Sequence, residues 1–83
     1  MDVILSEDAE KDLLRLPKFQ QIKVRKKLLA LKKNPMSGKK LSGELLSYYS
    51  LRAWPYRIIY QINQIEKRIE VSAIIHRQGA YRN

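Results

Sequence analysis

The apolar residues in the first half of the chain recur with a helical period. Ala9, Leu13 and Leu16 are spaced i, i+4 and i+7, so the pattern predicts a helix over residues 7–16. Ser6 is a favourable N-cap, because its hydroxyl can accept a hydrogen bond from a backbone N–H of the first turn. The helix dipole favours negative charge in the first turns, which carry Glu7, Asp8 and Glu10.

A second helix is predicted over residues 19–33, after Pro17 and before the pair Asn34–Pro35. One apolar stripe on this helix consists of Val24, Leu28 and Leu31. A second apolar side consists of Phe19, Ile22 and Leu29. Two apolar sides predict that the helix contacts both the sheet and the first helix, or a partner protein. Because the linker at Pro17 is short, we expect the two helices to form an antiparallel hairpin.

The second half of the chain changes to a period of two. Residues 34–45 are rich in Pro, Ser and Gly, which is typical of a loop. The alternating positions that follow predict strands over residues 46–53, 55–63 and 68–76, with the last hairpin turn at 63–67. Pro55 has no amide hydrogen, so we expect it at the turn or at a bulge between the first two of these strands.

The element order that follows is β-α-α-β-β-β, with a short first strand over residues 2–5. We therefore predict an α+β fold in which a helical hairpin packs on one face of a small, largely antiparallel sheet. At 83 residues, we expect residues 1–83 to form a single domain with a modest core.

Alternation along the strands predicts which side chains share a face of the sheet. The side chains expected to face the helices from the central strand are Tyr56, Ile58, Tyr60 and Ile62. Arg57 then lies on the opposite face, either as a solvated residue or with a functional role. In the last strand the pattern predicts one face with Ile69, Val71, Ala73 and Ile75, and the other face with Glu70, Ser72, Ile74 and His76.

The net charge of the chain limits the classes of partner that it is expected to bind. Lys and Arg number 17 against 8 acidic residues, which gives a net charge of +9 and a sequence pI near 10.0. Half of the acids fall in the first predicted helix, so the rest of the chain is still more basic. Such an excess favours a polyanionic partner: nucleic acid, a ribonucleoprotein, an acidic protein or an anionic membrane.

The other compositional features mainly exclude classes of protein and of chemistry. No apolar run is long enough to span a membrane, and the first residues lack the basic region of a signal peptide, so we expect a cytoplasmic protein with no membrane partner. The chain has no cysteine, which excludes disulfides and thiolate chemistry. A single His and scattered acids cannot easily assemble ligands, so we expect no metal ion or other cofactor.

Cationic and aromatic residues gather at the C-terminal end and on the central strand. From residue 46 onward the carboxylates are Glu66 and Glu70 alone, so most of these cations lack an acidic neighbour in sequence. Arginine, tyrosine and histidine without acids are typical of a surface that holds a phosphodiester. The competing interpretations are a structural histidine at His76 and a frayed basic terminus over residues 77–82.

The whole chain resembles the RelE/ParE superfamily of toxins from toxin–antitoxin pairs, and its ending resembles the RelE-type branch that cleaves mRNA. The resemblance rests on the segments Ala9-x-x-Asp12-Leu13, Pro35 before Lys40-Leu41, Leu51-Arg52, Tyr56-Arg57-Ile58-Ile59-Tyr60 and His76-Arg77-x-x-x-Tyr81-Arg82. It implies a fold like that of microbial ribonucleases and a cognate acidic antitoxin as partner. RelE-type members cleave mRNA, often on the ribosome, whereas ParE-type members inhibit DNA gyrase.

Carried over to this chain, the resemblance implies Arg57, Arg77 and Tyr81 as catalytic residues. The residues assigned to RNA binding are Lys39, Lys40, Arg52, His76 and Arg82. The chain departs from well-studied RelE toxins at Tyr48 and Ser50, where those toxins carry lysines. Lys39, Lys40 or Arg52 would supply some of the missing charge.

The chemistry expected at such a site is metal-free cleavage of RNA, arrest of translation and growth arrest. RNA carries its own nucleophile, the 2′-hydroxyl, so the protein must move protons and stabilise the charge on the phosphorane. Arg57 and Arg77 suit charge stabilisation, since a guanidinium offers paired donors to phosphate oxygens. Tyr81 or His76 would act as acid or base, and Tyr81 could equally stack on a base. The sequence contains no recognition-helix motif, so specific DNA binding by the toxin alone is not expected.

A second class of function stays open. The chain would then be a ParE-like inhibitor of DNA gyrase, or an inactive RelE-like protein that acts only as an antitoxin-bound co-repressor. The ParE-like alternative leaves the cluster of Arg57, His76, Arg77 and Tyr81 without a role, so this cluster is the sequence feature that discriminates between the two classes.

Overall fold

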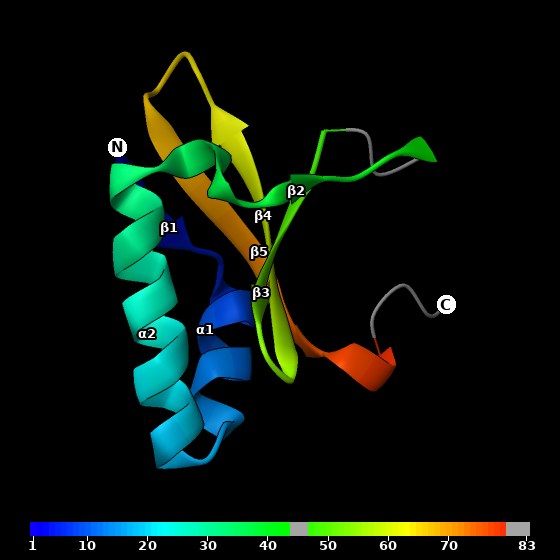
Figure 1. The fold of residues 1–83 in the computed structure, drawn as a ribbon. Coiled ribbons are helices and arrows are strands. Elements are labelled where there is room, and N and C mark those ends of the chain that lie inside the picture. Colours follow the sequence, from blue (N-terminus) through cyan, green and yellow to red (C-terminus); the bar gives the residue numbers. More distant parts are fainter. Residues whose placement is uncertain (44–46, 80–83) are drawn as a thin grey trace.

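The computed structural model describes residues 1–43 and 47–79 of the chain. Two helices lie on one side of a five-stranded sheet, as Figure 1 shows. The elements are β1 (Asp2–Leu5), α1 (Glu7–Arg15), α2 (Lys18–Lys33), β2 (Lys39–Lys40), β3 (Tyr49–Ala53), β4 (Tyr56–Asn63) and β5 (Arg68–His76), with 3₁₀ turns at Pro35–Ser37 and Arg77–Gly79. Within these residues, neither helix has the length and apolar character needed to cross a membrane.

The strand order in the sheet is β1-β5-β4-β3-β2. β1 runs parallel to β5, and the other neighbouring pairs are antiparallel. The predicted α+β class, with a helical hairpin on a largely antiparallel sheet, is confirmed. One expectation was incomplete: the stretch 34–45, predicted as a loop, also contains a 3₁₀ turn and the short edge strand β2. β3 begins at Tyr49 rather than at residue 46, which lies outside the described residues.

The helical hairpin is stabilised by local contacts at the start of α1 and at the linker between the two helices. The Ser6 hydroxyl accepts a hydrogen bond from the backbone N–H of Ala9 at 3.0 Å and caps α1. Pro17 separates the two helices, and the side-chain amide of Gln21 donates to the Leu16 carbonyl at 2.9 Å. This hydrogen bond fixes the linker against the first turn of α2.

The core lies between the helices and the sheet. It contains the predicted stripe of α2 together with residues of α1 and the strands: Ala9, Leu13, Val24, Leu28, Leu31, Ala53, Ile58, Tyr60, Ile69, Val71 and Ile74. The second apolar side of α2 stays open, because Phe19, Ile22 and Leu29 are between 57% and 69% exposed. These three side chains are therefore available to a partner.

A bulge in β5 changes the faces of the last strand. Ile59 pairs with Ala73 but Tyr60 pairs with Val71, so Ser72 has no partner in β4. Beyond it Ile74 is buried and Ile75 is half-buried. The prediction that Ile75 lies on the same face as Val71 was wrong, because it assumed an unbroken period of two.

Candidate functional site

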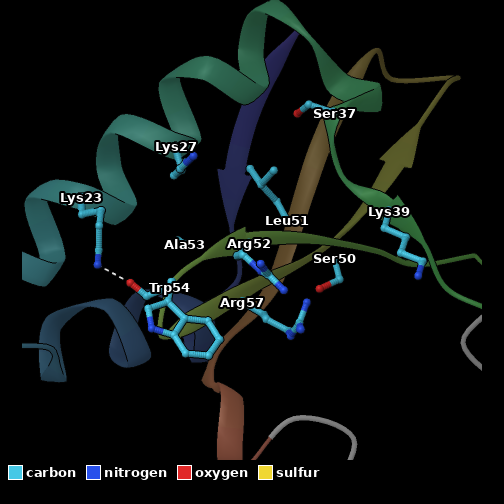
Figure 2. A pocket seen from close by; sticks show the side chains of 10 residues that line it. All are labelled: Lys23, Lys27, Ser37, Lys39, Ser50, Leu51, Arg52, Ala53, Trp54 and Arg57. Carbon is cyan, nitrogen blue, oxygen red and sulfur yellow. Dashed lines mark hydrogen bonds between the residues drawn. The ribbon is translucent and has the colours of Figure 1, made fainter.

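A groove of about 680 Å³ opens between α2 and β3 (Figure 2). Its lining residues are Lys23, Lys27, Ser37, Lys39, Ser50, Leu51, Arg52, Ala53, Trp54 and Arg57. Five of these ten residues are Lys or Arg, and within the part of the chain that the structure describes no acidic residue lines the groove. The groove is therefore suited to an anionic ligand. We call it the cationic groove.

Arg52 and Arg57 form the centre of the cationic groove. They are direct partners in the register of β3 and β4, so their side chains leave the same face of the sheet. Figure 2 shows both side chains directed into the groove near Ser50. Like charges directly opposite each other on a sheet are destabilising. Neither guanidinium has a carboxylate partner among the described residues, so a bound anion would relieve the repulsion.

Trp54 lies at the turn between β3 and β4 and is 52% exposed. The guanidinium carbon Cζ of Arg77 lies 4.9 Å from the centroid of the Trp54 ring, and Cζ of Arg52 lies 5.6 Å from it. The Nζ of Lys23 on α2 donates to the Trp54 carbonyl. The indole thus brings together arginines that come from opposite ends of the second half of the chain.

Arg77 reaches this position because it directly follows His76, the β5 residue that pairs with Tyr56. Its backbone N–H donates to the Pro55 carbonyl at 2.7 Å, next to Trp54. Arg52 then connects the two arginines predicted as catalytic, since it lies opposite Arg57 and shares the Trp54 ring with Arg77.

His76 is not part of the cationic groove. It pairs with Tyr56 in the register, and their rings meet edge to face with centroids 5.4 Å apart. Tyr56 alternates with Arg57, so His76 belongs to the opposite face of the sheet. Its Nδ1 accepts a hydrogen bond from the backbone N–H of Gln78 at 3.2 Å.

Of the other predicted site residues, some line the cationic groove and others do not. Lys39 lines it, whereas Lys40 is exposed and is not among the lining residues. Tyr81 and Arg82 lie outside the described residues. At the positions where the superfamily comparison expected lysines, Tyr48 is half-buried away from the lining and Ser50 is 4% exposed within it. The Ser50 hydroxyl has no hydrogen-bond partner among the described residues.

Sequence reasoning missed Trp54, Lys23 and Lys27. The two lysines lie at i and i+4 on α2 and line the groove from the helix side. Their spacing is visible in the sequence, but a pair of lysines on a helix is more often a solvated face. For Trp54 the available signal was a large aromatic residue two positions after Arg52, directly before the turn at Pro55.

The chemistry available in this groove is the binding of phosphate groups. A guanidinium presents several donors in a planar fork, and two such groups side by side can hold one phosphodiester from two directions. Among the described residues, no group of three or more His, Asp or Glu side chains is placed to hold a metal ion.

The fold matches solved toxin structures over most of its length. A chain of the RelBE2 toxin–antitoxin complex from Mycobacterium tuberculosis gives a TM-score of 0.85 at 27% sequence identity, with 90% of this chain and 95% of that chain covered. A chain of the archaeal RelE–RelB complex from Pyrococcus horikoshii OT3 gives a TM-score of 0.77 at 26% identity, with 95% and 97% covered. The YoeB/ParE toxin from Agrobacterium tumefaciens gives a TM-score of 0.79 at 20% identity, with 92% and 98% covered. The fold is that of the RelE/ParE superfamily.

The family is defined by the sequence match. Residues 3–81 match the family model described as the ParE toxin of the type II toxin–antitoxin system, parDE. The chain belongs to this family, and the resemblance to toxins of the RelE/ParE superfamily is confirmed. A comparison with curated proteins gives no match. The matched names include RelE, YoeB and ParE, so membership alone does not distinguish mRNA cleavage from gyrase inhibition.

Proposed function

We propose that this toxin is an mRNA endoribonuclease that binds its substrate in the cationic groove. The observation that carries the proposal is the pairing of Arg52 with Arg57 in a groove that no described acidic residue lines. Among the described residues neither guanidinium has a carboxylate partner, and two such groups on one face fit a phosphodiester better than they fit a protein surface of mixed charge.

The proposed reaction is attack of the RNA 2′-hydroxyl on the adjacent phosphate, with loss of the 5′-oxygen of the next nucleotide. Arg57 and Arg77 would stabilise the additional negative charge of the phosphorane. One group must remove the proton of the 2′-hydroxyl and another must protonate the leaving oxygen. Because His76 belongs to the face opposite Arg57, we assign proton transfer to Tyr81 rather than to His76. Lys39, Lys40 and Arg82 would bind neighbouring phosphates.

We also propose that cleavage depends on the ribosome. The toxin has Tyr48 and Ser50 at the positions where well-studied RelE toxins carry lysines. A tyrosine alone is a poor base near neutral pH, since its unperturbed pKa is about 10. The ribosome and the message it holds would then supply orientation and part of the proton transfer.

We propose an acidic, partly helical antitoxin as the protein partner. An apolar groove of about 330 Å³ lies between α2 and β1, lined by Val3, Leu5, Arg25, Leu28, Leu29 and Lys32. Its apolar floor and two basic rim residues suit an amphipathic helix that carries acidic side chains. The exposed residues Phe19 and Ile22 lengthen the apolar surface of α2. Structures similar to this chain include toxin–antitoxin complexes.

A second candidate function is inhibition of DNA gyrase, which the match to the ParE family favours. An inactive homologue that acts as an antitoxin-bound co-repressor is favoured by the absence of lysine at positions 48 and 50. In both cases the cationic groove would have no RNA substrate.

One experiment separates these functions. The toxin is induced without antitoxin, cellular mRNA is mapped by primer extension, and gyrase supercoiling is measured with the purified toxin. Arg57→Ala is the test variant. Arg25→Ala is the matched control, because it removes an exposed arginine that lies on α2 outside the cationic groove.

The endoribonuclease predicts codon-phased cuts that Arg57→Ala abolishes and Arg25→Ala retains. Intact message with inhibited supercoiling would establish the gyrase inhibitor instead. Intact message, normal supercoiling and normal growth would establish the inactive homologue.

A further inference from the structure

The Trp54 side chain is a large aromatic ring held at the mouth of a cationic groove. It is 52% exposed although its neighbours in the groove are mainly charged. Exposure of an aromatic ring in such a place is unfavourable for folding and is typical of a binding surface.

The backbone around Trp54 is fixed from two sides. Lys23 of α2 donates to the Trp54 carbonyl, and the N–H of Arg77 donates to the carbonyl of Pro55 at 2.7 Å. On the strand side, Ala53 pairs with Tyr56 to close the turn. The ring is therefore presented by a turn that is tied to both a helix and the end of β5.

Arg52 and Arg77 both make cation–π contacts with this ring. Their Cζ atoms lie over the ring at 5.6 and 4.9 Å from its centroid, within the ~6 Å of a cation–π contact, and Trp54 is still 52% exposed. The exposed part of Trp54 is thus bordered by positive charge and is accessible to a planar ligand. An exposed ring beside arginines is the arrangement by which proteins bind single-stranded nucleic acid, with bases on the ring and phosphates on the cations.

We propose that Trp54 is a stacking platform for one unpaired nucleobase, and that Arg52 and Arg77 bind phosphates on either side of it. This inference rests on the proposed function and specifies its substrate, which is a single strand recognised by a base as well as by charge. The toxin then has affinity for single-stranded nucleic acid without the ribosome.

The test measures the binding of oligonucleotides that the toxin cannot cleave. Trp54 is the one tryptophan of the chain, so fluorescence excited where the five tyrosines do not absorb reports on this position alone. The full-length toxin, separated from its antitoxin, is titrated with a 2′-deoxy oligothymidylate of about ten nucleotides, a length within the usual site size of such modules. The comparison ligand is an abasic deoxyribose-phosphate strand of the same length and charge. Since neither ligand has a 2′-hydroxyl, neither can be cleaved.

We expect the oligothymidylate to quench Trp54 fluorescence and to bind at least tenfold more tightly than the abasic strand. Anisotropy of a labelled oligothymidylate then compares the variants. Trp54→Ala should weaken binding about tenfold or more, and Trp54→Phe should recover part of the loss because it retains a ring. Phe19→Ala removes an aromatic side chain that is 69% exposed on α2 outside the groove, and it should leave binding unchanged. Circular dichroism confirms that each variant is folded.

Equal affinity for the two ligands, or unchanged oligonucleotide binding by folded Trp54→Ala, would overturn the proposal that Trp54 is a stacking platform. Weaker antitoxin binding by Trp54→Ala with unchanged oligonucleotide binding would also overturn it, because Trp54 would then be a protein contact. Failure of the proposed function looks different: cellular message stays intact while the oligonucleotide still binds through Trp54.

Discussion

The Oδ2 atom of Asp12 accepts a hydrogen bond from the backbone N–H of Ile74 at 3.1 Å. Asp12 lies on α1 and Ile74 lies on β5, two residues past the bulge at Ser72. At the same edge the Ser6 hydroxyl donates to the Ser72 carbonyl at 3.1 Å. β1 pairs with β5 only as far as Val71. Side chains of the α1 segment therefore satisfy backbone groups of β5 where its neighbouring strand has ended.

Replacing Asp12 with alanine should destabilise the toxin by about 1–3 kcal/mol, because a partly buried N–H loses its acceptor. Hydrogen exchange at the Ile74 amide should accelerate more than exchange at Ile58, which lies in the centre of the sheet. Asp12→Asn keeps an acceptor oxygen and should lose less. Asp8→Ala removes an exposed acid from the same helix and serves as the control. An Asp12→Ala variant as stable as the wild type would show that the hydrogen bond contributes nothing.

The helical half of the fold follows from local patterns in the sequence. The stripe Val24, Leu28 and Leu31 is buried, and Ser6 caps α1 as its residue type predicts. The bulge at Ser72 was not predicted, because alternation along one strand contains no signal for an extra residue. Its position depends on the partners of two other elements, Tyr60 on β4 and Asp12 on α1.

The candidate site was predicted only in part for a similar reason. The sequence identified Arg52, Arg57 and Lys39, which line the cationic groove. It also identified Arg77, which lies against Trp54. It gave no indication that Lys23 of α2 lies across from the β3–β4 turn. That proximity depends on how α2 packs against the sheet, which the period of either element alone does not determine.

Gly38 is predicted to be intolerant of any side chain. A Cβ atom at this position would overlap the hydroxyl and ring of Tyr60, which is fully buried and cannot move aside. Gly38→Ala should therefore cost about 1–3 kcal/mol of unfolding free energy, as overpacking typically does. Gly43 is the control, since a Cβ there meets nothing within 4 Å. Its positive φ of 68° adds a backbone cost, so Gly43→Asn is the fairer comparison. A Gly38→Ala protein as stable as the wild type would mean that the Tyr60 ring relaxes freely.

Tyr60 is predicted to make the toxin sensitive to alkaline pH. Burial raises the pKa of its hydroxyl above the ordinary 10.0, although the hydrogen bond from the Gly38 N–H opposes this shift. In the unfolded chain the tyrosine loses its proton near pH 10, while the folded protein still retains it. The folded state then binds more protons, so stability is complete below pH 10 and falls as the pH rises above it.

The comparison variant for this effect is Tyr60→Phe. It loses the hydrogen bonds to Gly38 and Pro35, and should be less stable at neutral pH by about 1–3 kcal/mol. Above pH 10 its stability should decline less steeply than that of the wild type. Urea unfolding at several pH values measures both slopes. Parallel slopes would show that Tyr60 does not titrate differently in the two states.

In antitoxin binding, charge should mainly control the association rate, and apolar contacts should mainly control the dissociation rate. Added salt should slow association much more than it speeds dissociation, because long-range attraction acts mainly on encounter. Arg25→Ala, at the rim of the apolar groove, should lower the association rate, and Leu29→Ala, in the same groove, should raise the dissociation rate. Surface plasmon resonance at several salt concentrations separates the two rates. Equal sensitivity of both rates to salt would contradict this division.

The final prediction concerns the arginines. Arg57→Ala, Arg77→Ala and Tyr81→Ala should each abolish toxicity and leave the fold and antitoxin binding largely intact. Loss of one transition-state phosphate contact should cost about 3–4 kcal/mol, or on the order of a hundredfold or more in cleavage rate. Arg57→Lys should also fail substantially, because an ammonium cannot reproduce the paired donors of the guanidinium.

Lys32 and Lys33 provide the control for charge alone. Both are exposed at the end of α2, outside the cationic groove. Their replacement by alanine should weaken RNA or ribosome binding modestly, and the difference should vanish at high salt. Growth arrest after induction and primer extension on cellular mRNA measure the effect of every variant. If folded Arg57→Ala still arrests growth and still cuts message, the active surface lies elsewhere on the toxin.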